Sequence, residues 1–78
     1  MYNNQKLSNN AEVMLAYVKK FIKLRGYSPS HKEIADNTYN SKYMVYKALI
    51  ELEQKEYIRR QKKKPRTIVV RGMRMVED

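Results

Sequence analysis

The side chains best suited to chemistry form two groups in the second half of the chain. The first is a basic run, positions 57 to 76, without a single acidic residue. Its members are Arg59, Arg60, Lys62, Lys63, Lys64, Arg66, Arg71 and Arg74. Guanidinium and ammonium groups at this density favour a polyanion partner, whose phosphates they neutralise. A disordered, solvated basic tail is the alternative, but the β-branched residues that follow position 66 argue for strand structure instead.

The second group contains tyrosine, methionine and lysine side chains within a short segment. Tyr43 and Lys47 are four residues apart, so they share one face if this segment is helical. Tyr46 lies beside them and Met44 on the opposite flank. Lysine can reach guanine acceptors or phosphates, and tyrosine can donate to a phosphate or pack on a thymine methyl group. The alternatives are that Tyr46 and Met44 are packing residues and that Lys47 is an ordinary solvated lysine.

Catalysis and metal binding lack the residues they need. The chain has no cysteine, and His31 is its single histidine, which cannot build a zinc site alone. No pair of carboxylates has a plausible geometry for acid and base catalysis. We therefore expect a protein that is not an enzyme and that needs no cofactor or metal. His31 itself is expected to be a first-turn helix residue, near a nucleic-acid backbone or solvent, with no special role.

Length and charge narrow the class of protein further. The chain has 78 residues, and 17 Lys and Arg against 8 Asp and Glu give a net charge of +9. A domain of this size buries only about 60% of its unfolded surface, so helix and sheet packing must hold it together without disulfides. No stretch approaches the ~18 apolar residues of a membrane span, and no apolar signal-peptide core follows the polar N-terminus. A cytoplasmic protein with no membrane partner is expected.

Three helices are predicted to position the second group. Ser8 or Asn9 caps the first helix, and Gly26 ends it. Its apolar residues at helical spacing are Ala11, Met14, Leu15, Val18, Phe21 and Ile22. The second helix, about 31–37, opens with a Ser-x-x-Glu capping box at Ser30. Residues 37–40 are weak helix formers and predict a turn.

The third helix and a hairpin complete the predicted fold. Ser41 caps a helix over about 42–55, with Val45, Ala48, Leu49 and Leu52 on its inward face. Residues 57–60 and 66–71 are predicted strands, joined by a loop, 61–65, whose length suits a hairpin.

This order of elements is that of a winged helix-turn-helix: mainly α, with three helices and a two-stranded β-hairpin wing. In such a fold the third helix lies in the major groove of DNA. The expected organisation is a disordered N-terminal arm over 1–7, the winged helix-turn-helix over 8–71, and a C-terminal tail over 72–78.

Several segments together resemble the DNA-binding domain of LexA repressors. They are Arg25-Gly26-Tyr27-Ser28-Pro29-Ser30, Lys32-Glu33-Ile34-Ala35, Leu49-Ile50-Glu51-Leu52-Glu53-Gln54-Lys55, Tyr57-Ile58-Arg59-Arg60 and Pro65-Arg66. The resemblance covers about residues 8–71. It implies a winged helix-turn-helix that binds operator half-sites as a dimer and reads bases with the start of its third helix.

Matched to this chain, the resemblance implies base-reading residues at Ser41, Tyr43, Met44, Tyr46 and Lys47 and a backbone contact by the Gln61–Arg66 loop. With the neighbouring residues of the predicted fold added, two sets of DNA-binding residues are expected. The recognition-helix set is Ser41, Lys42, Tyr43, Met44, Tyr46 and Lys47. The set expected on the DNA backbone, from the start of the second helix and the wing, is Ser30, Lys32, Arg60, Lys62, Lys63, Lys64 and Arg66.

The chain also departs from the family pattern. The turn before Ser41 is one residue short, and the bulky, aromatic reading positions argue against the usual LexA operator. The chain ends where the family's self-cleaving peptidase and dimerisation domain would begin, so no serine–lysine dyad can be assigned. Glu56 stands at the helix end, where the family often has glycine.

These observations predict sequence-specific binding of double-stranded DNA by a small transcriptional regulator. The regulator would be of phage or mobile-element type, or the isolated DNA-binding domain of a repressor. We expect a monomer in solution that binds a single half-site weakly. Affinity for DNA should rise only when two copies bind together.

Two other classes of function stay open. One is a protein-interaction module on the same scaffold, because Val13, Tyr17, Leu24 and Ile50 add apolar surface beyond the core face. These residues would form a partner or homodimer patch unless the hairpin and the N-terminal arm cover them. The other is a non-specific binder of RNA or single strands that stacks bases on its tyrosines.

Overall fold

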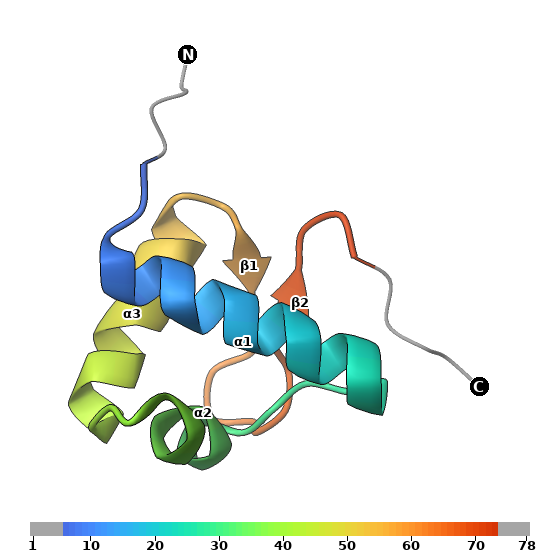
Figure 1. Ribbon diagram of the computed structural model, residues 1–78. Helices are drawn as coiled ribbons and strands as arrows, with labels where there is room; N and C mark the ends of the chain where they lie inside the picture. Colours follow the sequence, from blue (N-terminus) through green and yellow to red (C-terminus); the bar gives the residue numbers. More distant parts are fainter. Residues whose placement is uncertain (1–5, 74–78) are drawn as a thin grey trace.

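The computed structural model describes residues 6–73 of the chain. They form three helices, α1 (Asn9–Arg25), α2 (His31–Thr38) and α3 (Lys42–Gln54), followed by an antiparallel pair of strands, β1 (Ile58–Arg59) and β2 (Val69–Val70) (Figure 1). α1 lies across α3 and the hairpin, and α2 packs beside the start of α3. The predicted fold, three helices with a two-stranded wing, is confirmed.

Both ends of α1 are determined by local residues, a serine at the start and a glycine at the end. The Ser8 hydroxyl accepts the N–H of Ala11 at 3.2 Å, so Ser8 and not Asn9 is the cap. At the other end Gly26 takes a left-handed conformation, φ 83°, and its N–H donates to the Ile22 carbonyl. A side chain would be strained at this φ, which is why glycine ends the helix there.

α2 runs one residue further than predicted. Ser30 and Glu33 form the expected capping box, with both reciprocal hydrogen bonds present. The predicted turn over 37–40 is wrong at its first two residues. The side-chain amide of Asn37 donates a hydrogen bond to the Glu33 carbonyl, and the Thr38 hydroxyl donates one to the Ile34 carbonyl. Both side chains therefore hydrogen-bond to carbonyls of the preceding turn of the helix.

α3 begins as expected and ends in a strained turn. The Ser41 hydroxyl accepts the N–H of Met44 at 3.1 Å. Beyond Gln54, the N–H of Tyr57 donates to the Leu52 carbonyl, and Glu56 has a left-handed backbone with φ 64°. This is the Schellman arrangement, which favours glycine at the position that Glu56 occupies.

The strands are shorter than the predicted 57–60 and 66–71. Arg66, the first residue of the predicted second strand, has a positive φ of 58°, which a strand cannot accommodate. Between the strands the Thr67 hydroxyl accepts a hydrogen bond from the N–H of Gln61. It also lies in donor geometry to the carbonyls of Gln61 and Lys64. A side chain thus organises the loop where a longer ladder was expected.

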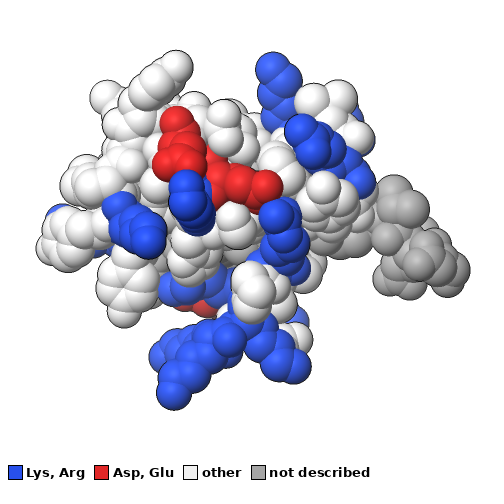
Figure 2. All heavy atoms as spheres, turned by 90° about the horizontal axis from the view of Figure 1, so that it is seen from below, with Lys and Arg blue, Asp and Glu red and all other residues white. Residues whose placement is uncertain are grey.

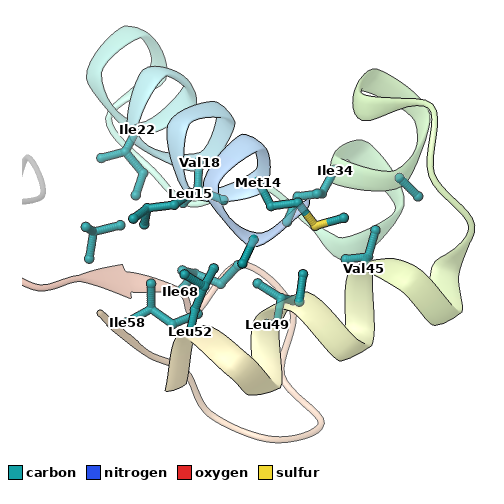
Figure 3. Packing of buried hydrophobic residues seen from close by; sticks show 14 residues of the cluster. Met14, Leu15, Val18, Ile22, Ile34, Val45, Leu49, Leu52, Ile58 and Ile68 are labelled. Carbon is teal, nitrogen blue, oxygen red and sulfur yellow. The ribbon is translucent and has the colours of Figure 1, made fainter. Parts of the chain in front are cut away.

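One hydrophobic cluster joins all the elements (Figure 3). α1, α2 and α3 contribute most of it, and Ile58, Ile68 and Val70 close it from the hairpin. Ser28 is buried beneath the wing, where its hydroxyl accepts the N–H of Ile68 at 3.2 Å. The connection between α1 and α2 is therefore tied to the hairpin as well as to the helices.

The ends of the described chain also contact the core. Leu7, which was expected in the disordered arm, packs against the cluster, and so does Met73 from the expected tail. Glu51 accepts hydrogen bonds from both the N–H and the hydroxyl of Ser8, each 2.8 Å long. Residues 1–5 of the predicted arm and 74–78 of the predicted tail, including Arg74 of the basic run, lie outside the described residues.

Candidate nucleic-acid interface

The two faces of α3 separate as its spacing predicted. Val45, Leu49 and Leu52 are fully buried, whereas the Tyr43 side chain on the opposite face is 65% exposed. The Lys47 ammonium group lies 5.6 Å from the centre of the Tyr43 ring. These two side chains therefore form one exposed aromatic and cationic pair, a geometry that favours a cation–π contact.

The remaining residues of the predicted recognition set surround this pair. Tyr46 and Met44 are partly exposed on its flanks, and Lys42 is exposed in the first turn. The oxygen of the Ser41 hydroxyl is occupied as the helix cap. The predicted set therefore surrounds the N-terminal half of α3 and leaves the core face untouched.

Tyr39 is a neighbour of this set that the sequence reasoning did not select. It lies in the turn between α2 and α3, with a left-handed backbone of φ 58° and a side chain that is 95% exposed. Both its exposure and its left-handed backbone are visible only in the structure, so no signal in the sequence would have selected Tyr39.

The basic residues predicted on the DNA backbone lie on α2 and the wing. Figure 2, which views the molecule from below Figure 1, shows Lys and Arg side chains spread over this face. Lys62, Lys63 and Lys64 are exposed on the loop of the wing. On α2, Lys32 is exposed and lies 2.9 Å from Asp36, and the hydrogen bond to that carboxylate raises the pKa of Lys32.

Arg66 bonds back to α2. Its Nη1 and Nη2 donate to the two carboxylate oxygens of Glu33 at 2.9 and 3.0 Å, and Nη1 also donates to the Ser28 carbonyl. The hydrogen bonds from Arg66, followed by the one from the Ser30 N–H, hold the pKa of Glu33 below its usual value. Arg66 therefore fixes the wing against the start of α2.

Arg60 is mostly covered by α3. Its side chain is only 9% exposed, and its Nε lies 3.2 Å from a carboxylate oxygen of Glu53. The guanidinium carbon is 5.9 Å from the centre of the Tyr46 ring. Both predicted wing arginines thus have partners inside the protein, whereas the wing lysines point to solvent.

The extra apolar residues of α1 do not form one patch. Leu24 and Val13 are 72% and 53% exposed, so the hairpin and the described part of the arm do not cover them. Tyr17, between them, packs against the core and against the Phe21 ring, and burial raises its pKa.

Two further observations limit the kinds of site. Within residues 6–73, no group of three or more His, Cys, Asp and Glu side chains is arranged to hold a metal ion. None of the described helices is long and apolar enough to span a membrane.

The arrangement of α2, α3 and the hairpin defines the chain as a winged helix-turn-helix of the DNA-binding class. The profile of the family described as "LexA DNA binding domain" matches residues 4–67, most of the chain, and the chain belongs to this family. Membership in this family gives the chain the fold of a DNA-binding domain.

Curated relatives agree with this family. The LexA repressor of Shouchella clausii is 46% identical over 66 residues, which cover 83% of this chain and 32% of the relative. That of Caldicellulosiruptor saccharolyticus is 40% identical over 67 residues, 85% of this chain and 33% of the relative. That of Oceanobacillus iheyensis is 39% identical over 71 residues, 90% of this chain and 34% of the relative. The chain therefore spans about a third of the length of these relatives.

Proposed function

We propose that the chain acts as the DNA-reading module of a small transcriptional repressor, in the cytoplasm. The exposed start of α3 enters the major groove, and the wing and the start of α2 contact the flanking phosphates. The observation that carries this proposal is the exposed Tyr43–Lys47 pair, opposite the fully buried core face of the same helix. Neither side chain is needed for packing, so both are available to a groove.

The proposed roles differ between the lysines and the arginines of the wing. Lys62, Lys63 and Lys64 neutralise phosphates directly, because their side chains are exposed. Arg60 and Arg66 act mainly by holding the wing in place, since acidic side chains of α3 and α2 already bind them. At the start of α2, Lys32 and the capping residue Ser30 contact phosphates of one DNA strand.

The reading face is proposed to recognise a site unlike that of the LexA relatives. Tyr43, Met44 and Tyr46 are large and partly apolar, so they suit thymine methyl groups and tight packing against base edges. Two copies occupying neighbouring half-sites would read a longer operator, as expected for helix-turn-helix proteins.

Selection of bound duplexes from a random pool tests the proposal. The chain should enrich a short common motif, and a single strand of the same motif should compete at least about tenfold more weakly than the duplex. A pool without enrichment, bound equally well as single strands, would support base stacking on the tyrosines instead. Complete absence of nucleic-acid binding would support a protein-interaction module, for which Val13 and Leu24 are exposed apolar residues on α1.

A further inference from the structure

A cavity of about 270 Å³ lies between the start of α2 and the wing. Every ionisable side chain in its lining is basic. The lining residues are His31, Arg60, Gln61, Lys63, Lys64 and Pro65. The cavity is open to solvent, and its lining comes from two elements that are far apart in the sequence, α2 and the wing.

Three features of the lining suit an anionic group. Lys63 and Lys64 bring ammonium groups from the wing, and Arg60 brings a nearly buried guanidinium from the end of β1. His31 is the first residue of α2, where backbone N–H groups lack intrahelical acceptors and the helix dipole favours negative charge. No acidic residue lines the cavity, and three carboxylates of α2 and α3 are in ion pairs: Glu53 with Arg60, Glu33 with Arg66 and Asp36 with Lys32.

We propose that this cavity binds one phosphodiester group of the DNA backbone and that His31 takes up a proton when the phosphate enters. The proposal rests on the proposed function, because it assigns a phosphate contact to the same DNA complex. It gives His31 a role that was not expected from the sequence, and it makes binding of DNA sensitive to pH.

The charges around His31 in the free protein explain why a bound phosphate would favour protonation of its ring. Partial burial, followed by the charge of Arg60, lowers the pKa of His31 below its usual value, so protonation of the ring is disfavoured in the free protein. Lys63 and Lys64 line the same cavity from the wing. A bound phosphate opposes this positive charge and accepts a hydrogen bond from the imidazolium, and both effects favour the protonated ring.

The sign of the effect follows by linkage. If the pKa of His31 is higher in the complex than in the free protein, affinity rises as pH falls through the interval between the two values. For one proton the dissociation constant changes by at most about tenfold per pH unit in that interval. Because His31 is the only histidine of the chain, no other side chain has an ordinary pKa near 6.5.

The test measures affinity for one duplex at fixed salt between about pH 5 and pH 7. The wild-type chain should bind more tightly at the acidic end, and His31→Gln should remove this dependence while leaving affinity near pH 7 almost unchanged. In parallel, NMR titration of the His31 ring should give a higher pKa in the complex than in the free protein. Because His31 is only partly covered and lies outside the hydrophobic core, the substitution should also leave the melting temperature nearly unchanged.

Lys64→Gln and Lys62→Gln form the matched pair of variants, since Lys64 lines the cavity and Lys62 does not. In the complex with Lys62→Gln the His31 pKa should rise as in the wild type, and with Lys64→Gln the rise should be smaller. A flat pH profile, an unshifted ring or a pH dependence that survives His31→Gln overturns the phosphate site while duplex binding stands. Failure to bind any duplex at any pH overturns the proposed function and this inference together.

Discussion

Glu33 and Arg66 form a two-pronged ion pair between α2 and the wing, with N–O distances of 2.9 and 3.0 Å. The same Glu33 carboxylate accepts the N–H of Ser30 in the capping box. One side chain therefore caps the second helix of the helix-turn-helix unit and fixes the position of the hairpin relative to it. Paired guanidinium and carboxylate groups in this geometry are directional as well as attractive.

This ion pair predicts that the folded domain becomes less stable at acidic pH. The folded pKa of Glu33 is lowered, so its stabilising contribution is present above the unfolded pKa, about 4.3, and disappears as pH falls through the folded value. The melting temperature of the wild-type chain should therefore fall below about pH 5, and that of Glu33→Gln should fall less. Circular dichroism melts over this range check the prediction.

Arg66→Lys provides the control for this ion pair, because lysine keeps the charge but cannot donate to both carboxylate oxygens in the same planar geometry. Its effect and that of Glu33→Gln should be non-additive in the double variant. Additive effects on the free energy of unfolding would mean that the two side chains stabilise the fold independently.

The left-handed backbone of Glu56 predicts that a glycine at this position stabilises the domain. Its φ of 64° carries a strain that glycine does not have. After allowing for the greater unfolded-state entropy of glycine, Glu56→Gly should stabilise the domain by roughly 0.5–1 kcal/mol. Lys55→Gly is the control, because Lys55 has a φ of −93° and gains nothing there. Urea denaturation decides between them, and a lower stability of Glu56→Gly would contradict the strain inferred for this turn.

The wing predicts a uniform effect on all duplexes. Replacing Lys62, Lys63 and Lys64 with alanine removes exposed charges that no base recognises, so specific and scrambled duplexes should weaken about equally. The slope of log affinity against log salt should shrink by roughly 0.9 for each phosphate that the variant no longer neutralises. Titrations at several salt concentrations measure the slope. An unchanged slope would mean that the wing is a solvated loop whose lysines contact no phosphate.

The exposed residues of α1 predict a monomer in solution. Val13 and Leu24 are eleven positions apart on the helix, which separates them by about 16 Å along its axis. Tyr17 between them packs inward, so no continuous apolar patch joins the two. Sedimentation at micromolar concentration should give a single monomeric species. A dimer that Leu24→Glu dissociates would show that these residues are an interface.

Local signals in the sequence were sufficient for the helices and their faces. Ser8, Ser30 and Ser41 each cap the helix that follows, and the buried stripe of α3 repeats at helical spacing. Each of these features depends on residues within a turn or two of one another. The order of helices and hairpin then led to the correct fold.

What the sequence could not supply depends on distant contacts. Arg66 and Glu33 are 33 positions apart, so nothing in either segment indicates their ion pair. Thr67 shortens the strands through bonds across the loop, and Arg60 packs under Tyr46 because α3 passes over it. The cavity beside His31 likewise exists only once α2 and the wing meet.

The most direct test of the central claim, that the exposed face of α3 reads DNA, compares Lys47→Ala with wild type on one selected and one scrambled duplex at fixed salt. Lys20→Ala, an exposed lysine on α1, is the matched control for removal of a charge. We expect an unchanged melting temperature and an affinity reduced by about 1–3 kcal/mol on the selected duplex, with a far smaller reduction on the scrambled one. Tyr43→Ala should behave in the same way. Full affinity and full discrimination in both variants would contradict the claim.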